Sequence, residues 1–97
     1  MKTISVKELK AKFDNSENFQ LIDIREEYEL EIACIGGDHI PMGEVRNNLD
    51  KIRKDIPVII HCRGGKRSGN MVVFLSDNGY DNLYSLHGGI NAWAEQI

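Results

Sequence analysis

The stretch that decides the fold is "PVIIHCRGGKRSGNMVVFL", which spans residues 57–75. It opens with a short β-branched run over residues 57–62, and its proline stands first, where a missing amide harms a strand least. Gly64 and Gly65 then interrupt the hydrophobic pattern, and residues 67–78 resume it with the dense apolar content of a packed helix. The stretch therefore predicts a buried strand, a tight loop and a helix in direct succession.

The segments on either side alternate between strand and helix in the same way. Ser5 and Glu8 form a capping-box pattern, so a helix is expected to begin after Ser5. Compact aliphatic runs predict further strands at 19–24 and 82–86, with a very short one near 39–40, and helices are expected over 25–32, 42–52 and 88–97. This alternation predicts an α/β fold, a small parallel sheet flanked by helices on both faces, formed by a single domain over 1–97.

The composition excludes several classes of partner. A formal net charge of -3 and a pI of about 5.5 argue against nucleic acid or an acidic membrane surface, because both require a basic field. The segment "MKTISVKELKAKF" lacks the apolar run of a signal peptide, so we expect a cytoplasmic protein, with a monomer as the default state. Two cysteines are too few for a disulfide scaffold or a zinc site.

The loop after the strand is the candidate functional site. In parallel sheets, ligands bind beyond the carboxyl ends of the strands, and Cys62 stands at such an end. Gly64 and Gly65 allow the loop to curl so that backbone amides point inward. Among Arg63, Lys66 and Arg67, a thiol at a helix amino terminus should be largely ionised at neutral pH. The pattern therefore predicts that Cys62 is a nucleophile with an anionic substrate.

The sequence resembles a rhodanese-type single-domain sulfurtransferase. "LIDIREEYE", "VIIHCRGGKRS" and "LHGGINAW" resemble the recurring segments of that family and follow in the family's order. In the family loop, four residues separate the cysteine from an arginine, and Cys62 and Arg67 stand at that spacing. The similar cysteine phosphatases have five intervening residues, so the shorter loop disfavours phosphate-ester hydrolysis or arsenate reduction, which remains an alternative.

The resemblance implies a rhodanese-like fold, no metal or organic cofactor, and a specific chemistry. Cys62 would take the sulfane sulfur of thiosulfate or a similar small anion, and a thiol, cyanide or protein acceptor would then remove it from the resulting persulfide. The substrate-binding loop would be formed by Arg63, Gly64, Gly65, Lys66, Arg67 and Ser68. A rhodanese-like binding module without turnover is the alternative from another class, and the intact cysteine counts against it.

The remaining candidates have weaker patterns. Asp23 and Arg25 resemble the family's pair near the loop, and they either support the loop or form a simple ion pair at a strand end. His61 should point to the face opposite Cys62, which argues against a general base. Cys34 replaces the histidine usual in the family, as in rhodanese domains fused to sulfur-carrier activating enzymes. We expect it to be a buried structural residue, with a resolving thiol for Cys62 as the alternative.

Overall fold

The computed structural model describes residues 2–97 and contains one five-stranded sheet. Its strands are β1 (Thr3–Ile4), β2 (Gln20–Asp23), β3 (Asp38–His39), β4 (Val58–His61) and β5 (Leu83–Leu86). They lie in the order β1-β5-β4-β2-β3, and every pairing is parallel. The predicted α/β class is therefore confirmed.

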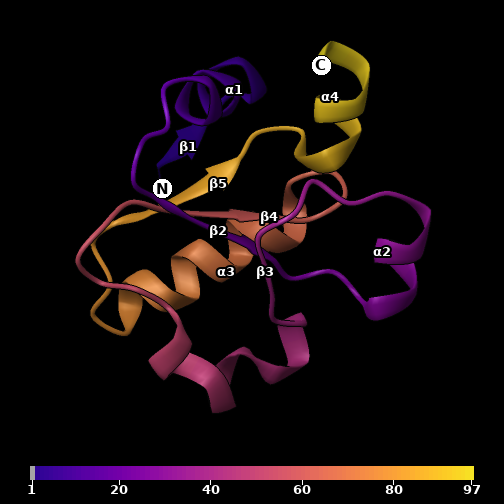
Figure 1. Ribbon diagram of the computed structural model, residues 1–97. Helices are drawn as coiled ribbons and strands as arrows, with labels where there is room; N and C mark the ends of the chain where they lie inside the picture. The colour runs from indigo at the N-terminus through magenta and orange to yellow at the C-terminus, as the bar shows by residue number, and fades with distance from the viewer. Residues whose placement is uncertain (1) are drawn as a thin grey trace.

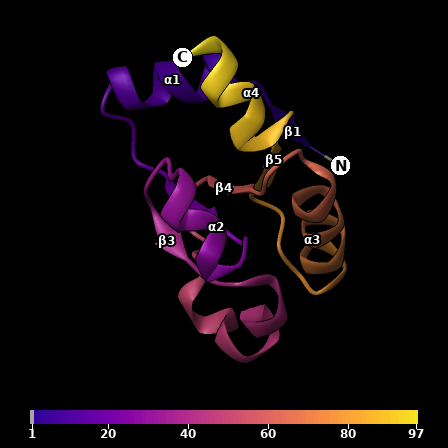
Figure 2. The ribbon, with the colours of Figure 1, turned by 90° about the vertical axis from the view of Figure 1, so that its right-hand side faces the viewer.

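Helices cover both faces of this sheet. They are α1 (Val6–Asp14), α2 (Glu27–Ile32), η1 (Met42–Lys51), α3 (Lys66–Asp77) and α4 (Gly89–Gln96). Figures 1 and 2 both show α1 and α4 together on one side of the sheet, with α3 and the 42–51 segment on the other. No helix within residues 2–97 combines the length and apolarity that crossing a bilayer requires.

The alternation of side chains along β4 builds the two halves of the core. Ile59 joins the cluster under α1 and α4, which includes Leu9 and Leu86. Ile60 and Cys62 instead belong to the larger cluster under α3 and η1. Because successive residues face opposite ways, the side chain of Cys62 is placed on the α3 side of the sheet.

Two helix ends follow the local sequence closely. The Ser5 hydroxyl accepts the Glu8 amide at 3.1 Å while the Glu8 carboxylate accepts the Ser5 amide, so the predicted capping box is confirmed. At the end of α3, Gly79 has φ +96° and the Tyr80 amide returns to the Leu75 carbonyl. This is the glycine-ended cap expected after a helix of this kind.

Two elements of the fold differ from the sequence prediction. β1 was not predicted, because two residues are too short to show a period, and it is defined only by pairing with β5. The regular helix expected over 42–52 is a 3₁₀ segment, interrupted at Asn48, where φ is -131°. The Asn48 side chain donates to the Glu44 carbonyl at 2.8 Å, a local bond that competes with regular helical geometry.

Candidate active site

Cys62 lies directly after β4, at the carboxyl edge of the sheet, and its residue is only 1% exposed. Residues 63–65 form the loop that connects it to α3. Gly65 caps that helix with a φ of +105°, a conformation that side chains of L-amino acids rarely adopt. The loop thereby turns back over the sulfur at the amino terminus of α3, as the sequence predicts.

Backbone amides of this loop converge on the sulfur. The amides of Gly65 and Ser68 donate to Cys62 Sγ at 3.2 and 3.3 Å. The thiol in turn reaches the Ser68 hydroxyl, with 3.5 Å between Sγ and Oγ. Amides directed at one atom favour negative charge on that atom.

The last helix holds the opposite side of the loop. The amides of Ile90 and Asn91 donate to the carbonyls of Cys62 and Arg63, each at 3.0 Å. Gly89 makes this contact possible, because a Cβ there would lie 2.5 Å from both carbonyl oxygens. The carbonyls are therefore bound by α4, on the side of the loop away from the amides that face the sulfur.

The hydrogen bonds that the loop donates to Sγ determine the acidity of the Cys62 thiol. Burial by itself raises the pKa of Cys62, but hydrogen bonds from the Ser68 hydroxyl and from the amides of Ser68, Gly65 and Gly64 outweigh it. The pKa of Cys62 therefore lies below the ordinary value for a cysteine. A larger share of the sulfur is a thiolate, the form that acts as a nucleophile.

The three cations of the loop have different surroundings. Arg67 forms a two-point ion pair with Glu29 of α2, with both nitrogen–oxygen distances at 3.1 Å. The hydrogen bonds to Glu29 raise the pKa of Arg67, and the nearby sulfur of Cys62 adds to the effect. Arg63 and Lys66 are exposed, and neither forms an ion pair with any residue from 2 to 97.

Asp23 and Arg25 form a buried ion pair beside the loop, with relative exposures of 1% and 3%. The Arg25 side chain donates to both carboxylate oxygens at 2.7 to 3.1 Å, and its Nη2 also donates to the Ala33 carbonyl at 2.8 Å. Burial by itself raises the pKa of Asp23, but hydrogen bonds from Arg25 outweigh it and the pKa is lowered overall. The pair ties the end of β2 to the end of α2.

His61 is fully buried on the side of β4 opposite Cys62. Its Nε2 lies 3.7 Å from Asp23, and neither ring nitrogen has a hydrogen-bond partner among residues 2–97. Burial lowers the pKa of His61, which favours the neutral ring. The predicted orientation away from Cys62 agrees with this placement.

Cys34 is exposed, so the expectation of a buried structural cysteine is wrong. It follows α2 in the loop after Ala33, where Arg25 holds only the backbone. The hydrophobic residue of that loop is instead Ile35, which packs against the core under α4. In this loop Ile35 is therefore turned inward, and the Cys34 side chain is left in solvent.

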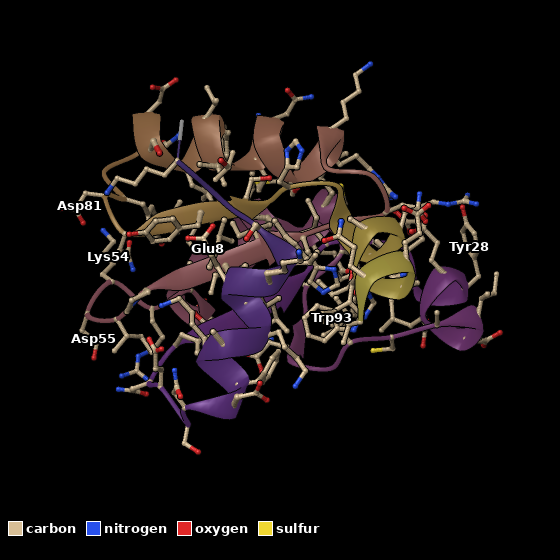
Figure 3. The ribbon with its side chains drawn as sticks, turned by 90° about the horizontal axis from the view of Figure 1, so that it is seen from above. Glu8, Tyr28, Lys54, Asp55, Asp81 and Trp93 are labelled. Atoms are coloured by element: carbon tan, nitrogen blue, oxygen red, sulfur yellow. The ribbon has the colours of Figure 1, made fainter. Side chains whose placement is uncertain are left out.

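A cleft of about 200 Å³ adjoins the cysteine loop. Its walls include Arg63 from the loop, Tyr28 and Ile32 from α2, and Ile90 and Asn91 from α4. Ile32 is 86% exposed and Tyr28 66% exposed, and Figure 3 shows Tyr28 at the outer edge of the molecule, on the α2 side. A larger cavity of about 600 Å³ contacts residues such as Lys12, Phe19 and Arg53 and does not include the cysteine loop.

Residues 5–96 match a family model described as the rhodanese-like domain. The chain belongs to the rhodanese family. A sulfurtransferase of Allochromatium vinosum is 34% identical over 94% of this chain and 86% of its own length. The thiosulfate sulfurtransferase GlpE of Actinobacillus succinogenes is 33% identical over 80% of this chain and 71% of its own length. These relatives support an enzyme of the sulfurtransferase type.

The rhodanese fold is also found in solved structures. A rhodanese-like domain protein from Staphylococcus aureus is 35% identical, covers 96% of this chain and 91% of its own, and superposes with a TM-score of 0.87. A protein from Staphylococcus saprophyticus is 30% identical, covers 99% and 96% of the two chains, and gives a TM-score of 0.89. The predicted family and fold class are confirmed together.

Sequence reasoning missed several residues of this rhodanese site. Glu29 lies in a helix that the sequence predicts, but its ion pair with Arg67 joins positions 38 residues apart and has no local signal. Gly89 falls near the start of the helix expected over 88–97, and its close contact with the loop carbonyls was not foreseen. No local pattern marks Ser85, whose contact with Ser68 depends on the packing of α3 against β5.

Proposed function

We propose that this rhodanese domain is a thiosulfate sulfurtransferase that carries sulfane sulfur as a persulfide on Cys62. The thiolate of Cys62 attacks the outer sulfur of thiosulfate, and a new sulfur–sulfur bond forms as the old one breaks. Sulfite departs with the electron pair of the broken bond. A thiolate acceptor or cyanide then attacks the terminal sulfur, and Cys62 leaves as a thiolate again.

The observation that carries this proposal is the set of amides around Sγ. The amides of Gly65 and Ser68 lie 3.2 and 3.3 Å from the sulfur, in a loop with four residues between Cys62 and Arg67. Such donors stabilise a thiolate before attack and, with little movement, the terminal sulfur of a persulfide afterwards. The thiosulfate sulfurtransferase GlpE among the relatives supports thiosulfate as the donor.

The cations of the loop divide the binding of the donor between them. Arg63 and Lys66 have no acidic partner among residues 2–97, so their charge is available to the sulfonate oxygens of the incoming anion. Arg67 stays paired with Glu29 and contributes fixed positive charge beside the sulfur. Asp23 and Arg25 support the neighbouring backbone rather than contact the donor.

Intact-protein mass spectrometry tests this proposal directly. Wild type, Cys62→Ser and Cys34→Ser are incubated with thiosulfate, desalted, weighed and then treated with a reductant. We expect a gain of one sulfur atom on wild type and on Cys34→Ser, reversed by the reductant, and no gain on Cys62→Ser. An adduct that disappears with Cys34→Ser but survives in Cys62→Ser would refute the assignment of the nucleophile.

A second assay separates sulfur transfer from the alternatives. With thiosulfate and cyanide, the proposed enzyme releases thiocyanate and sulfite in equal amounts. Hydrolysis of an aryl phosphate by Cys62 without thiocyanate release would favour a cysteine phosphatase. No adduct and no turnover with either substrate would favour a binding module.

A further inference from the structure

A second buried hydroxyl lies behind the active-site serine. Ser85 of β5 is 3% exposed, and its Oγ lies 2.7 Å from Ser68 Oγ. Ser68 is itself buried and reaches Cys62 Sγ at 3.5 Å. Ser85, Ser68 and Cys62 therefore form a continuous chain of polar atoms that begins on β5 and ends at the sulfur.

The position of Ser85 is otherwise suited to an apolar side chain. Its register partner on β4 is Ile60, and the preceding residue on its face of β5, Leu83, belongs to the same hydrophobic cluster as Ile60 and Cys62. A hydroxyl placed there costs free energy unless it is hydrogen-bonded. Within residues 2–97, Ser68 Oγ is the one hydrogen-bond partner of the Ser85 side chain.

The hydrogen bonds of the Ser68 hydroxyl determine how Ser85 can influence the sulfur. Its oxygen accepts from the Cys62 thiol, and its proton is directed to the Gly65 carbonyl at 3.1 Å. When the thiol ionises, it no longer donates, and the Ser68 O–H becomes the donor available to the sulfur. A donor from Ser85 to the Ser68 oxygen strengthens that O–H, because hydrogen bonds in a chain polarise one another.

We propose that Ser85 is a positioning residue for the nucleophile: it donates to Ser68 Oγ and thereby makes the Ser68 hydroxyl a better donor to the Cys62 thiolate. Within residues 2–97, Ser85 forms no hydrogen bond to the sulfur, and it acts through Ser68. Its removal raises the pKa of Cys62, because the charged form of the thiol loses part of its stabilisation.

The charged groups around Cys62 form their ion pairs without Ser85. Groups on the neighbouring elements are Asp23 and Arg25 at the end of β2, Glu29 on α2, His61 on β4, Arg63 and Lys66 in the loop, Arg67 on α3 and His87 after β5. The two ion pairs among them, Asp23 with Arg25 and Glu29 with Arg67, do not include Ser85. A shift caused by removal of the Ser85 hydroxyl is therefore assigned to the hydroxyl chain.

The test is a pH titration of the Cys62 thiolate by its ultraviolet absorbance. It is done in a Cys34→Ser background, so that one thiol remains, and it requires no sulfur transfer. Ser85→Ala should raise the midpoint by about half a pH unit, the size expected for one weakened hydrogen bond. Ser76→Ala, which removes an exposed hydroxyl from the same α3 helix, should leave the midpoint unchanged.

Two further comparisons separate positioning from simple packing. Ser85→Thr and Ser85→Val have nearly the same shape, and only the threonine variant should retain the low midpoint, even if both lose stability. In a Ser68→Ala background, Ser85→Ala should add no further shift, because its action passes through Ser68. Equal midpoints for the threonine and valine variants, or a full shift without Ser68, would overturn the proposal.

The outcome is independent of the proposed sulfur transfer. A raised midpoint in Ser85→Ala supports the positioning role even if thiosulfate leaves no sulfur on wild type. An unchanged midpoint refutes the role even if Cys62 forms the persulfide. The mass measurement therefore tests sulfur transfer, and the titration tests the role of Ser85, so that either proposal can be refuted without the other.

Discussion

Replacement of Gly89 by alanine should loosen the cysteine loop from α4. A Cβ at this position would lie 2.5 Å from the carbonyl oxygens of both Cys62 and Arg63, and backbone atoms cannot give way as a flexible side chain can. Relief of that clash requires α4 to move away from the loop. The bonds from the amides of Ile90 and Asn91, each 3.0 Å long, would be lost or lengthened.

The expected loss of stability can be assembled from these contacts. Alanine at the left-handed φ of +58° costs about 1 kcal/mol. Two backbone hydrogen bonds contribute about 1 kcal/mol each. Gly89→Ala should therefore lower the free energy of unfolding by about 3 kcal/mol, a large part of the stability of a domain of this size.

Urea denaturation measures this loss, and two other glycines supply matched controls. Gly36→Ala has only the positive φ, +110°, with nothing within 4 Å of the new Cβ, and should cost about 1 kcal/mol. Gly64→Ala lies in the cysteine loop itself in open space, without a positive φ, and should cost close to nothing. The thiolate titration should also move upward in Gly89→Ala alone. The reasoning is refuted if Gly89→Ala is no more destabilising than Gly36→Ala.

Three further predictions concern the charged residues Asp23 and Arg63. Asp23→Asn removes the partner of the buried Arg25 and should destabilise the fold by about 3 kcal/mol in urea, far more than the loss of an exposed pair through Asp55→Asn. Folding lowers the pKa of Asp23, so the contribution of its carboxylate to stability is fully present above the ordinary pKa of 3.8. That contribution is lost as the pH falls through the lower pKa of the folded state. Wild type should therefore lose stability more steeply than Asp23→Asn on acidification below about pH 4. Arg63→Ala should raise the KM for thiosulfate severalfold, with an effect that shrinks as salt is added, whereas Lys54→Ala, an equal change of charge away from the loop, should not. Equal effects of the two substitutions on KM would contradict a local role for Arg63.

The sequence was most informative where local chemistry determines structure. Glycines 64 and 65 between a β-branched run and an apolar helix predicted the loop around Cys62, and the structure places amides there at hydrogen-bond distance. The capping box at Ser5 was likewise readable, because cap and partner are three residues apart. Such features depend on neighbours in the chain, so a single sequence suffices to predict them.

Features that depend on distant segments were not predictable in the same way. Exposure of Cys34 follows from Ile35 being turned inward toward α4, and both residues are compatible with either orientation until the loop is packed. The Glu29 pair joins positions 38 residues apart, and the Ser68–Ser85 pair joins two elements through the packing of α3 on β5. Nothing in the spacing of these residues distinguishes them from exposed polar positions.

The contact between the cysteine loop and α4 also has a consequence for the order of synthesis. Cys62 emerges from the ribosome before residues 89–96, in which the amides of Ile90 and Asn91 donate to the carbonyls of its loop. β5, which supplies Ser85, is likewise made late. A nascent chain that has not yet reached these residues lacks the amides that bind the carbonyls of Cys62 and Arg63, so the loop gains its last backbone contacts only when α4 docks.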